Sequence, residues 1–141
     1  MKPIKIPGLD ERVYSLIGPY AMSAKFIKDN GNPIITSELH TWYVCFDEDE
    51  RLSCFCSVKF SNSVKNMQIG NLFILSGGKK SFNTLIKQII KDTAKEKGLG
   101  LRAYANNKNK DDFMKMGFEM LSEGVNWHNL KYNDERLRSS K

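Results

Sequence analysis

A short stretch rich in glycine and lysine, residues 76–81, has the residue types and spacing for anion binding. It reads Ser-Gly-Gly-Lys-Lys-Ser, follows a mostly apolar run at 67–75 and precedes an amphipathic segment that begins at Phe82. A loop that enters a helix offers unpaired N–H groups and the positive end of the helix dipole, and such a loop can hold a phosphate. The alternative is a simple turn between strand and helix. The position before the longest amphipathic segment favours the phosphate loop.

Three other chemistries are disfavoured by spacing. A P-loop needs Gly-x-x-x-x-Gly-Lys-Ser/Thr. Here Phe73 stands at the position of the first glycine, and Lys80 stands at the position of the Ser or Thr. Ser76 has no evident His and Asp partners for a hydrolase triad. A zinc site would have to be drawn from the set His40, Cys45, Cys54 and Cys56, which contains no Cys-x-x-Cys knuckle.

The elements around the loop form a βαβ unit. Residues 67–75 are apolar enough for a buried strand, and Gly98 is placed to stop the helix that follows the loop. A second strand is expected at 99–105, then a short helix around 110–116. The two strands should lie parallel in one sheet. The helix is predicted from an apolar stripe at helical spacing: Phe82, Leu85, Ile86, Ile89, Ile90, Thr93 and Ala94.

The rest of the chain predicts an α+β fold with a mixed, mostly antiparallel sheet, a central parallel pair and helices on both faces. Gly18-Pro19 separates two helical segments, 10–17 and 20–28. Period-two alternation predicts a hairpin from 40–46 and 51–60, and a final hairpin from 118–121 and 125–132. We expect a single domain, 1–141, with an extended lead-in at 1–9 and a flexible tail at 133–141.

Composition limits the partners. The net charge of +6, from 22 Lys and Arg against 16 Asp and Glu, favours an anionic partner such as a nucleotide cofactor, a nucleic acid or an acidic protein; it can equally be a solubility charge. No stretch of the sequence is long and apolar enough for a membrane span. The N-terminus lacks the apolar segment of a secretory signal peptide. Three clustered cysteines fit reduced thiols, so we expect a cytoplasmic protein. The exposed edge of the final hairpin suggests a possible homodimer.

This order of elements resembles that of the GCN5-related N-acetyltransferases, the GNAT superfamily. The resemblance covers roughly residues 10–132 as topology, and its motifs lie within 67–118. In that family a bulged strand binds the pantetheine arm of acetyl-CoA, and a loop of the form Arg/Gln-x-x-Gly-x-Gly/Ala binds its pyrophosphate. The matching segments here are 71–75 and 77–82, and the later family motif Tyr-x-x-x-Gly-Phe matches 113–118.

The resemblance implies an N-acyltransferase that moves an acetyl group from acetyl-CoA to an unknown amine of a small molecule, protein or nucleic-acid base. Backbone groups of the bulged strand would polarise the thioester carbonyl. Asn71 and Asn106 would orient the acceptor, and His128 would lie close to it. Glu38, His40 and Glu119 are further candidates for the base. The implied cofactor-binding residues are Leu72, Phe73, Ile74, Leu75, Gly77, Gly78, Lys79, Lys80, Ser81, Phe82, Asn107 and Phe113.

Two departures from the family pattern leave an alternative open. Lys80 and Phe82 replace loop glycines, and Gly77 replaces the loop Arg or Gln. Phe113 replaces a tyrosine that often serves as general acid, and phenylalanine has no proton to give. The alternative is therefore a non-catalytic GNAT-like module that binds a protein or nucleic-acid partner, although no basic stripe interleaved with aromatic residues is present.

Overall fold

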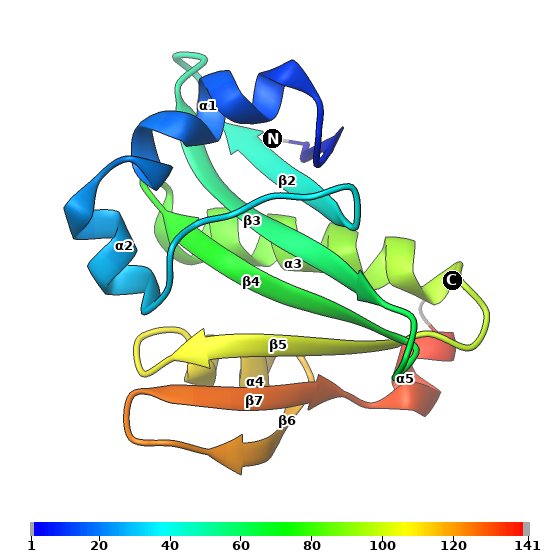
Figure 1. The fold of residues 1–141 in the computed structure, drawn as a ribbon. Helices are drawn as coiled ribbons and strands as arrows, with labels where there is room; N and C mark the ends of the chain where they lie inside the picture. Colours follow the sequence, from blue (N-terminus) through cyan, green and yellow to red (C-terminus); the bar gives the residue numbers. More distant parts are fainter. Residues whose placement is uncertain (1, 140–141) are drawn as a thin grey trace.

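The computed structural model describes residues 2–139, which form a mixed sheet with helices on both faces (Figure 1). The strand order is β1-β2-β3-β4-β5-β7-β6, and every neighbouring pair is antiparallel except β4 and β5. This confirms the predicted fold class and its central parallel pair. The strands are β1 (Ile4–Pro7), β2 (His40–Phe46), β3 (Leu52–Ser61), β4 (Asn66–Ile74), β5 (Gly100–Asn106), β6 (Phe118–Glu123) and β7 (Trp127–Tyr132). The helices are α1 (Glu11–Ala21), α2 (Ala24–Asn30), α3 (Gly78–Ala94), α4 (Lys110–Lys115) and α5 (Asp134–Arg138).

The parallel pair is joined over only part of its length. Asn66 to Ile69 of β4 pair with Gly100 to Ala103 of β5, and the pairing ends there. Beyond this point the two strands diverge, as Figure 1 shows, and β5 continues along β7 to Asn106. The edge of β4 that faces β5 is therefore left without a strand partner over residues 70–74.

A bulge lies at the start of this divergence. The register between β3 and β4 shifts between Phe55 and Ser57, so that Phe55 pairs with Phe73 while Ser57 pairs with Gly70. Asn71, inside the shift, has a φ of 52°. The extra residue changes which side chains face α3: Met67 and Ile69 pack on that side before the bulge, and Leu72 and Ile74 after it. A bulge in this segment was expected from the family resemblance.

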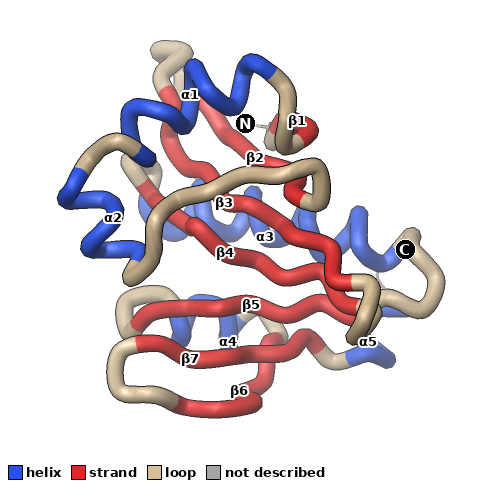
Figure 2. Tube along the Cα trace, in the orientation of Figure 1, coloured by secondary structure: helices blue, strands red, loops and turns tan. Residues whose placement is uncertain are grey.

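Each face of the sheet has its own core. Helices α1 and α2 and the connection 31–39 cover one face over β2, β3 and β4 (Figure 2). Val13, Ile17 and Ile34 pack there with Trp42 and Phe55. Helices α3, α4 and α5 cover the other face. The predicted stripe of α3 is buried there, which confirms the helical periodicity. No helix within residues 2–139 combines the length and apolar character needed to cross a bilayer.

Three elements differ from the sequence expectation. Helix α1 continues through Gly18 and Pro19 to Ala21, because the missing N–H of a proline costs one hydrogen bond near the helix end while Val13 and Ile17 stay buried. Residues 4–7 of the expected lead-in form β1 on β2. Residues 134–138 of the expected tail form α5, anchored by the buried Leu137; residues 140 and 141 lie outside the described part of the chain.

Candidate functional site

The bulge is held by two amide side chains and one hydroxyl, which come from three elements. Asn30, the last residue of α2, donates from Nδ2 to Asn71 Oδ1 at 2.8 Å. Asn71 in turn donates from its own Nδ2 to Ser57 Oγ at 2.8 Å, and Ser57 Oγ lies 3.3 Å from the Gly70 carbonyl, to which it donates. Asn71 is thus the residue that ties the bulge to β3 and α2.

A pocket of about 340 Å³, lined mostly by residues with polar side chains, opens at this point, on the face covered by α1 and α2. It gathers residues from α2, from the loop after it, and from strands β2, β3, β4, β5 and β7. Its described lining consists of Asn30, Asn32, His40, Ser57, Lys59, Gln68, Ile69, Gly70, Asn71, Tyr104, Trp127 and Asn129.

An aromatic pair forms one wall of the pocket. The rings of Tyr104 on β5 and Trp127 on β7 stack with centroids 4.8 Å apart and planes 11° from parallel. Gly31 lies against the indole: it has a φ of 78°, and a Cβ there would come within 2.8 Å of Trp127 Nε1. Glycine is therefore required at this position both by the backbone and by the close approach.

His40 is the titratable group with a shifted pKa in the described lining. Its Nδ1 lies 2.7 Å from Ser37 Oγ, and its side chain is buried beside Trp42. Burial, and secondly the positive charge of Lys59, lowers the pKa of His40 from the ordinary value of 6.5. The imidazole is therefore neutral at pH 7 and able to accept a proton.

The predicted phosphate loop joins β4 to α3 next to the splayed edge. Gly77 and Gly78 have φ values of 79° and 48°, so both glycines hold conformations that other residues rarely adopt. A Cβ on Gly77 would overlap the Ser81 hydroxyl, whereas Gly78 faces open space. The N–H groups of Leu75 and Ser76 both bond to the Ser53 carbonyl, at 2.7 and 2.9 Å. This anchors the loop to β3.

The loop and the splayed edge offer two different kinds of binding group. Residues 78–80 form the first turn of α3, where backbone N–H groups have no carbonyl within the helix to accept them. Lys79 and Lys80 are exposed on the same turn and add positive charge to the dipole end. An anionic group suits the helix terminus, and an amide-containing arm suits the unpaired edge of residues 70–74, which offers both donors and acceptors.

The side chains of three predicted cofactor residues face the core instead of the loop surface. Ser81 and Phe82 are buried, so Phe82 does not crowd the loop. Phe113 is fully buried, with ring centroids 5.0 Å from Phe82 and 5.1 Å from Phe118, both edge-on. Any cofactor contact at Ser81 or Phe82 is thereby left to the backbone.

Of the three proposed catalytic side chains, the structure brings only Asn71 to the pocket lining. Asn106 accepts a hydrogen bond from the Asn109 backbone N–H at 3.1 Å and so shapes the turn before α4. His128 is buried on the other face of β7 from Trp127, with Nε2 2.6 Å from Asn107 Oδ1. Among the described residues, its Nδ1 has no hydrogen-bond partner.

The cysteines and the acidic residues offer no second centre. Cys45, Cys54 and Cys56 are buried and free, and burial raises the pKa of the Cys56 thiol, which disfavours a reactive thiolate. Within residues 2–139, no group of His, Cys, Asp or Glu is arranged to hold a metal ion.

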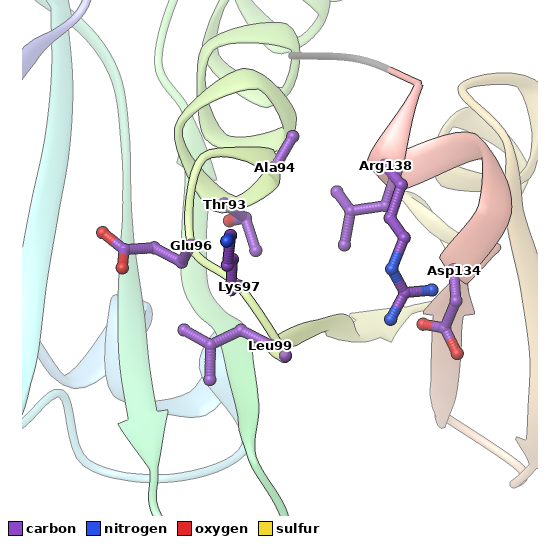
Figure 3. Close-up of a pocket in the computed structure, with 9 residues that line it drawn as sticks. Thr93, Ala94, Glu96, Lys97, Leu99, Asp134 and Arg138 are labelled. Atoms are coloured by element: carbon purple, nitrogen blue, oxygen red, sulfur yellow. The ribbon is translucent and has the colours of Figure 1, made fainter.

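Another pocket, of about 260 Å³, lies at the opposite end of α3, between that helix and α5 (Figure 3). Glu96 and Asp134 offset the charges of Lys97 and Arg138 in its lining. It is separated from the glycine loop by the length of α3, so we assign no part of the candidate site to it.

Several lining residues carry no signal at the level of the sequence. Asn30 and Asn32 lie in the sequence Asp-Asn-Gly-Asn-Pro, which is typical of a turn and predicts no site. Asn30 is 41 positions from Asn71. Tyr104 and Trp127 meet because β7 lies between β5 and β6.

Comparisons with known proteins identify the fold. No protein-family model and no curated protein matches the sequence. Among solved structures, mutant forms of the spermidine/spermine N-acetyltransferase SpeG from Vibrio cholerae align with a TM-score of 0.68 at 11% identity over 98% of each chain. A probable acetyltransferase from Staphylococcus epidermidis gives 0.68 at 17% identity, over 94% of this chain and 99% of its own.

A third match has a different description. TofI, solved in a ternary complex with an inhibitor and MTA, aligns with a TM-score of 0.68 at 8% identity, over 99% of this chain and 96% of its own. At such identities the likeness concerns the fold. The chain has the GNAT fold, and its structural neighbours are mostly acetyltransferases.

Proposed function

We propose that the chain is an N-acyltransferase that binds acetyl-CoA or a related acyl-CoA along the splayed edge of β4 and transfers the acyl group to an amine in the pocket beside the bulge. The observation that carries this proposal is the bulge at Asn71. Around it, residues 70–74 have no strand partner on the side of β5, and this unpaired edge lies beside the pocket. The same segment leads into the glycine loop at the start of α3.

The chain's own groups have separate tasks in this proposal. When bound, the acyl-CoA supplies a thioester whose C–S bond breaks as the amine nitrogen forms the new amide bond. Backbone N–H groups of 78–80 and the Lys79 and Lys80 ammonium groups hold phosphate oxygens. A backbone N–H of Leu72 or Phe73 donates to the carbonyl oxygen as negative charge develops.

His40 is the proton acceptor favoured by the structure. It lies in the pocket lining, and its lowered pKa keeps it neutral at pH 7, so that it can take the proton the amine loses. Asn71 acts as a positioning residue, because both ends of its amide already hold the bulge.

Isothermal titration with acetyl-CoA tests the proposal. We expect micromolar binding that weakens about tenfold or more in a Lys79→Ala, Lys80→Ala double variant and at high salt. Lys87→Ala, Lys91→Ala is the matched control, because it removes the same charge from α3 farther along the helix and should leave binding unchanged. Absence of heat and of a thermal shift at millimolar acetyl-CoA would overturn the acyl-CoA site.

A non-catalytic CoA-binding module is the second candidate. It is favoured by Phe113, which offers no proton and lies in the core, and by Asn106, whose side chain serves a turn. Release of free thiol from bound acetyl-CoA with a panel of amines separates the two. Tight binding without thiol release from any amine would favour the module.

A further inference from the structure

The pocket beside the bulge lacks the charge that a polyamine would require. Its described lining contains no Asp or Glu, while Lys59 contributes a basic side chain. A di- or tricationic substrate gains affinity from carboxylates that neutralise its ammonium groups. This lining instead offers amide, hydroxyl and imidazole groups, with a lysine among them.

Lys59, beside the neutral His40, gives one end of the pocket its basic group. The two residues are paired across β2 and β3, and Lys59 also pairs with Gln68 of β4, two positions before Gly70. After burial, the charge of Lys59 is the second cause of the lowered pKa of His40, as expected for groups paired on neighbouring strands. An anionic substituent placed here would gain a charge-assisted hydrogen bond from Lys59.

The aromatic pair marks the other end. Tyr104 follows Ala103, the last residue of β5 paired with β4, and so lies at the mouth of the splay. Its ring and that of Trp127 are stacked and partly exposed. Aromatic faces of this kind bind a planar ring by stacking and an ammonium group by cation–π attraction.

We propose that the acceptor is an amine that also carries a carboxylate or another anionic group, with its apolar or planar part on the Tyr104–Trp127 pair and its anionic group at Lys59. This inference deepens the proposed acyltransferase function and rests on it. It separates this chain from its structural neighbour SpeG, which acts on spermidine and spermine.

A matched pair of probes, phenylalanine and phenethylamine, tests the inference because the two differ only in the carboxylate; spermidine serves as a third probe. Binding is followed without acetyl-CoA by tryptophan fluorescence, with Trp127→Phe identifying the reporter, since Trp42 is fully buried. Turnover is followed separately by thiol release. We expect phenylalanine to bind about tenfold more tightly than phenethylamine, as one charge-assisted hydrogen bond provides, and spermidine to bind most weakly.

Variants assign the preference to Lys59. Lys59→Met should remove the tighter binding of phenylalanine and leave the affinity for phenethylamine unchanged. Lys115→Met removes an exposed charge on α4 and should change neither affinity.

Equal binding of the two probes, stronger binding of spermidine, or no fluorescence change with any probe would overturn the inference. A preference for phenylalanine without thiol release would support the inference as a binding specificity and contradict the acyltransferase proposal, whereas thiol release preferring spermidine would do the reverse.

Discussion

The two halves of β4 differ in their hydrogen-bonded neighbours. Residues 66–69 are hydrogen-bonded to β3 on one side and to β5 on the other, and they form the junction of the parallel pair. Residues 70–74 keep only the β3 side, after a bulge that changes which side chains face α3. One half therefore supplies rigidity, and the other supplies free backbone groups.

The contrast shows how a sheet can expose backbone without losing its core. Isolated polar backbone groups are costly in the interior, so an unpaired edge persists only beside solvent or a ligand. Here the exposed half remains anchored by Asn71, by the aromatic contact of Phe73 with Phe55, and by the loop bonds to Ser53. Substitutions in the two halves should therefore differ in what they damage.

The largest difference is expected between Ile69→Ala and Leu72→Ala. Ile69 is 0% exposed in the paired half, so its truncation should lower the free energy of unfolding by about 3–4 kcal/mol. Leu72 is only partly buried in the splayed half, and its loss should cost about 1–2 kcal/mol. Urea denaturation with unchanged m-values measures both. Equal losses would show that the splayed half is packed as firmly as the paired half.

The bulge itself is tested by Asn71→Ala and Asn71→Gly. Both variants lose the hydrogen bonds to Asn30 and Ser57, which together are worth about 1–2 kcal/mol. Alanine adds about 1 kcal/mol because it must hold a φ of 52°, which glycine accepts. We expect thermal and urea unfolding to rank the wild type above Asn71→Gly and that variant above Asn71→Ala. Two variants of equal stability would mean that the bulge relaxes to an ordinary φ.

The paired half of this comparison was predictable from sequence, and much of the splayed half was not. The period change at Phe82 and the apolar runs on either side of α3 predict the βαβ unit, because local periodicity determines which face is buried. The family resemblance placed a bulge near Asn71. The pocket depends on contacts distant in sequence, such as Asn30 with Asn71 and Tyr104 with Trp127, which no local pattern encodes.

Local rules also failed where tertiary packing outweighed them. Pro19 is read as a helix breaker, yet α1 extends past it because Tyr20 and Ala21 pack against the core on that face of the sheet. The charged segment 134–138 is too short to be stable as an isolated helix. It is held as α5 by Leu137 in the core and by the Asn133 side chain, which accepts the Arg136 N–H at 3.0 Å.

The smallest expected effect concerns His40, which lies across β3 from the paired half of β4. Because its pKa in the folded state is below 6.5, the unfolded chain binds a proton more readily than the folded chain as the pH falls through this value. The free energy of unfolding should therefore decrease between pH 6.5 and the lowered folded-state pKa. Comparison with His40→Gln separates the contribution of His40 from the contributions of the carboxylates. The wild type should lose more stability than the variant over that pH interval. Parallel pH profiles of the two proteins would show that His40 is protonated as easily in the folded chain as in the unfolded chain, and would contradict the lowered pKa.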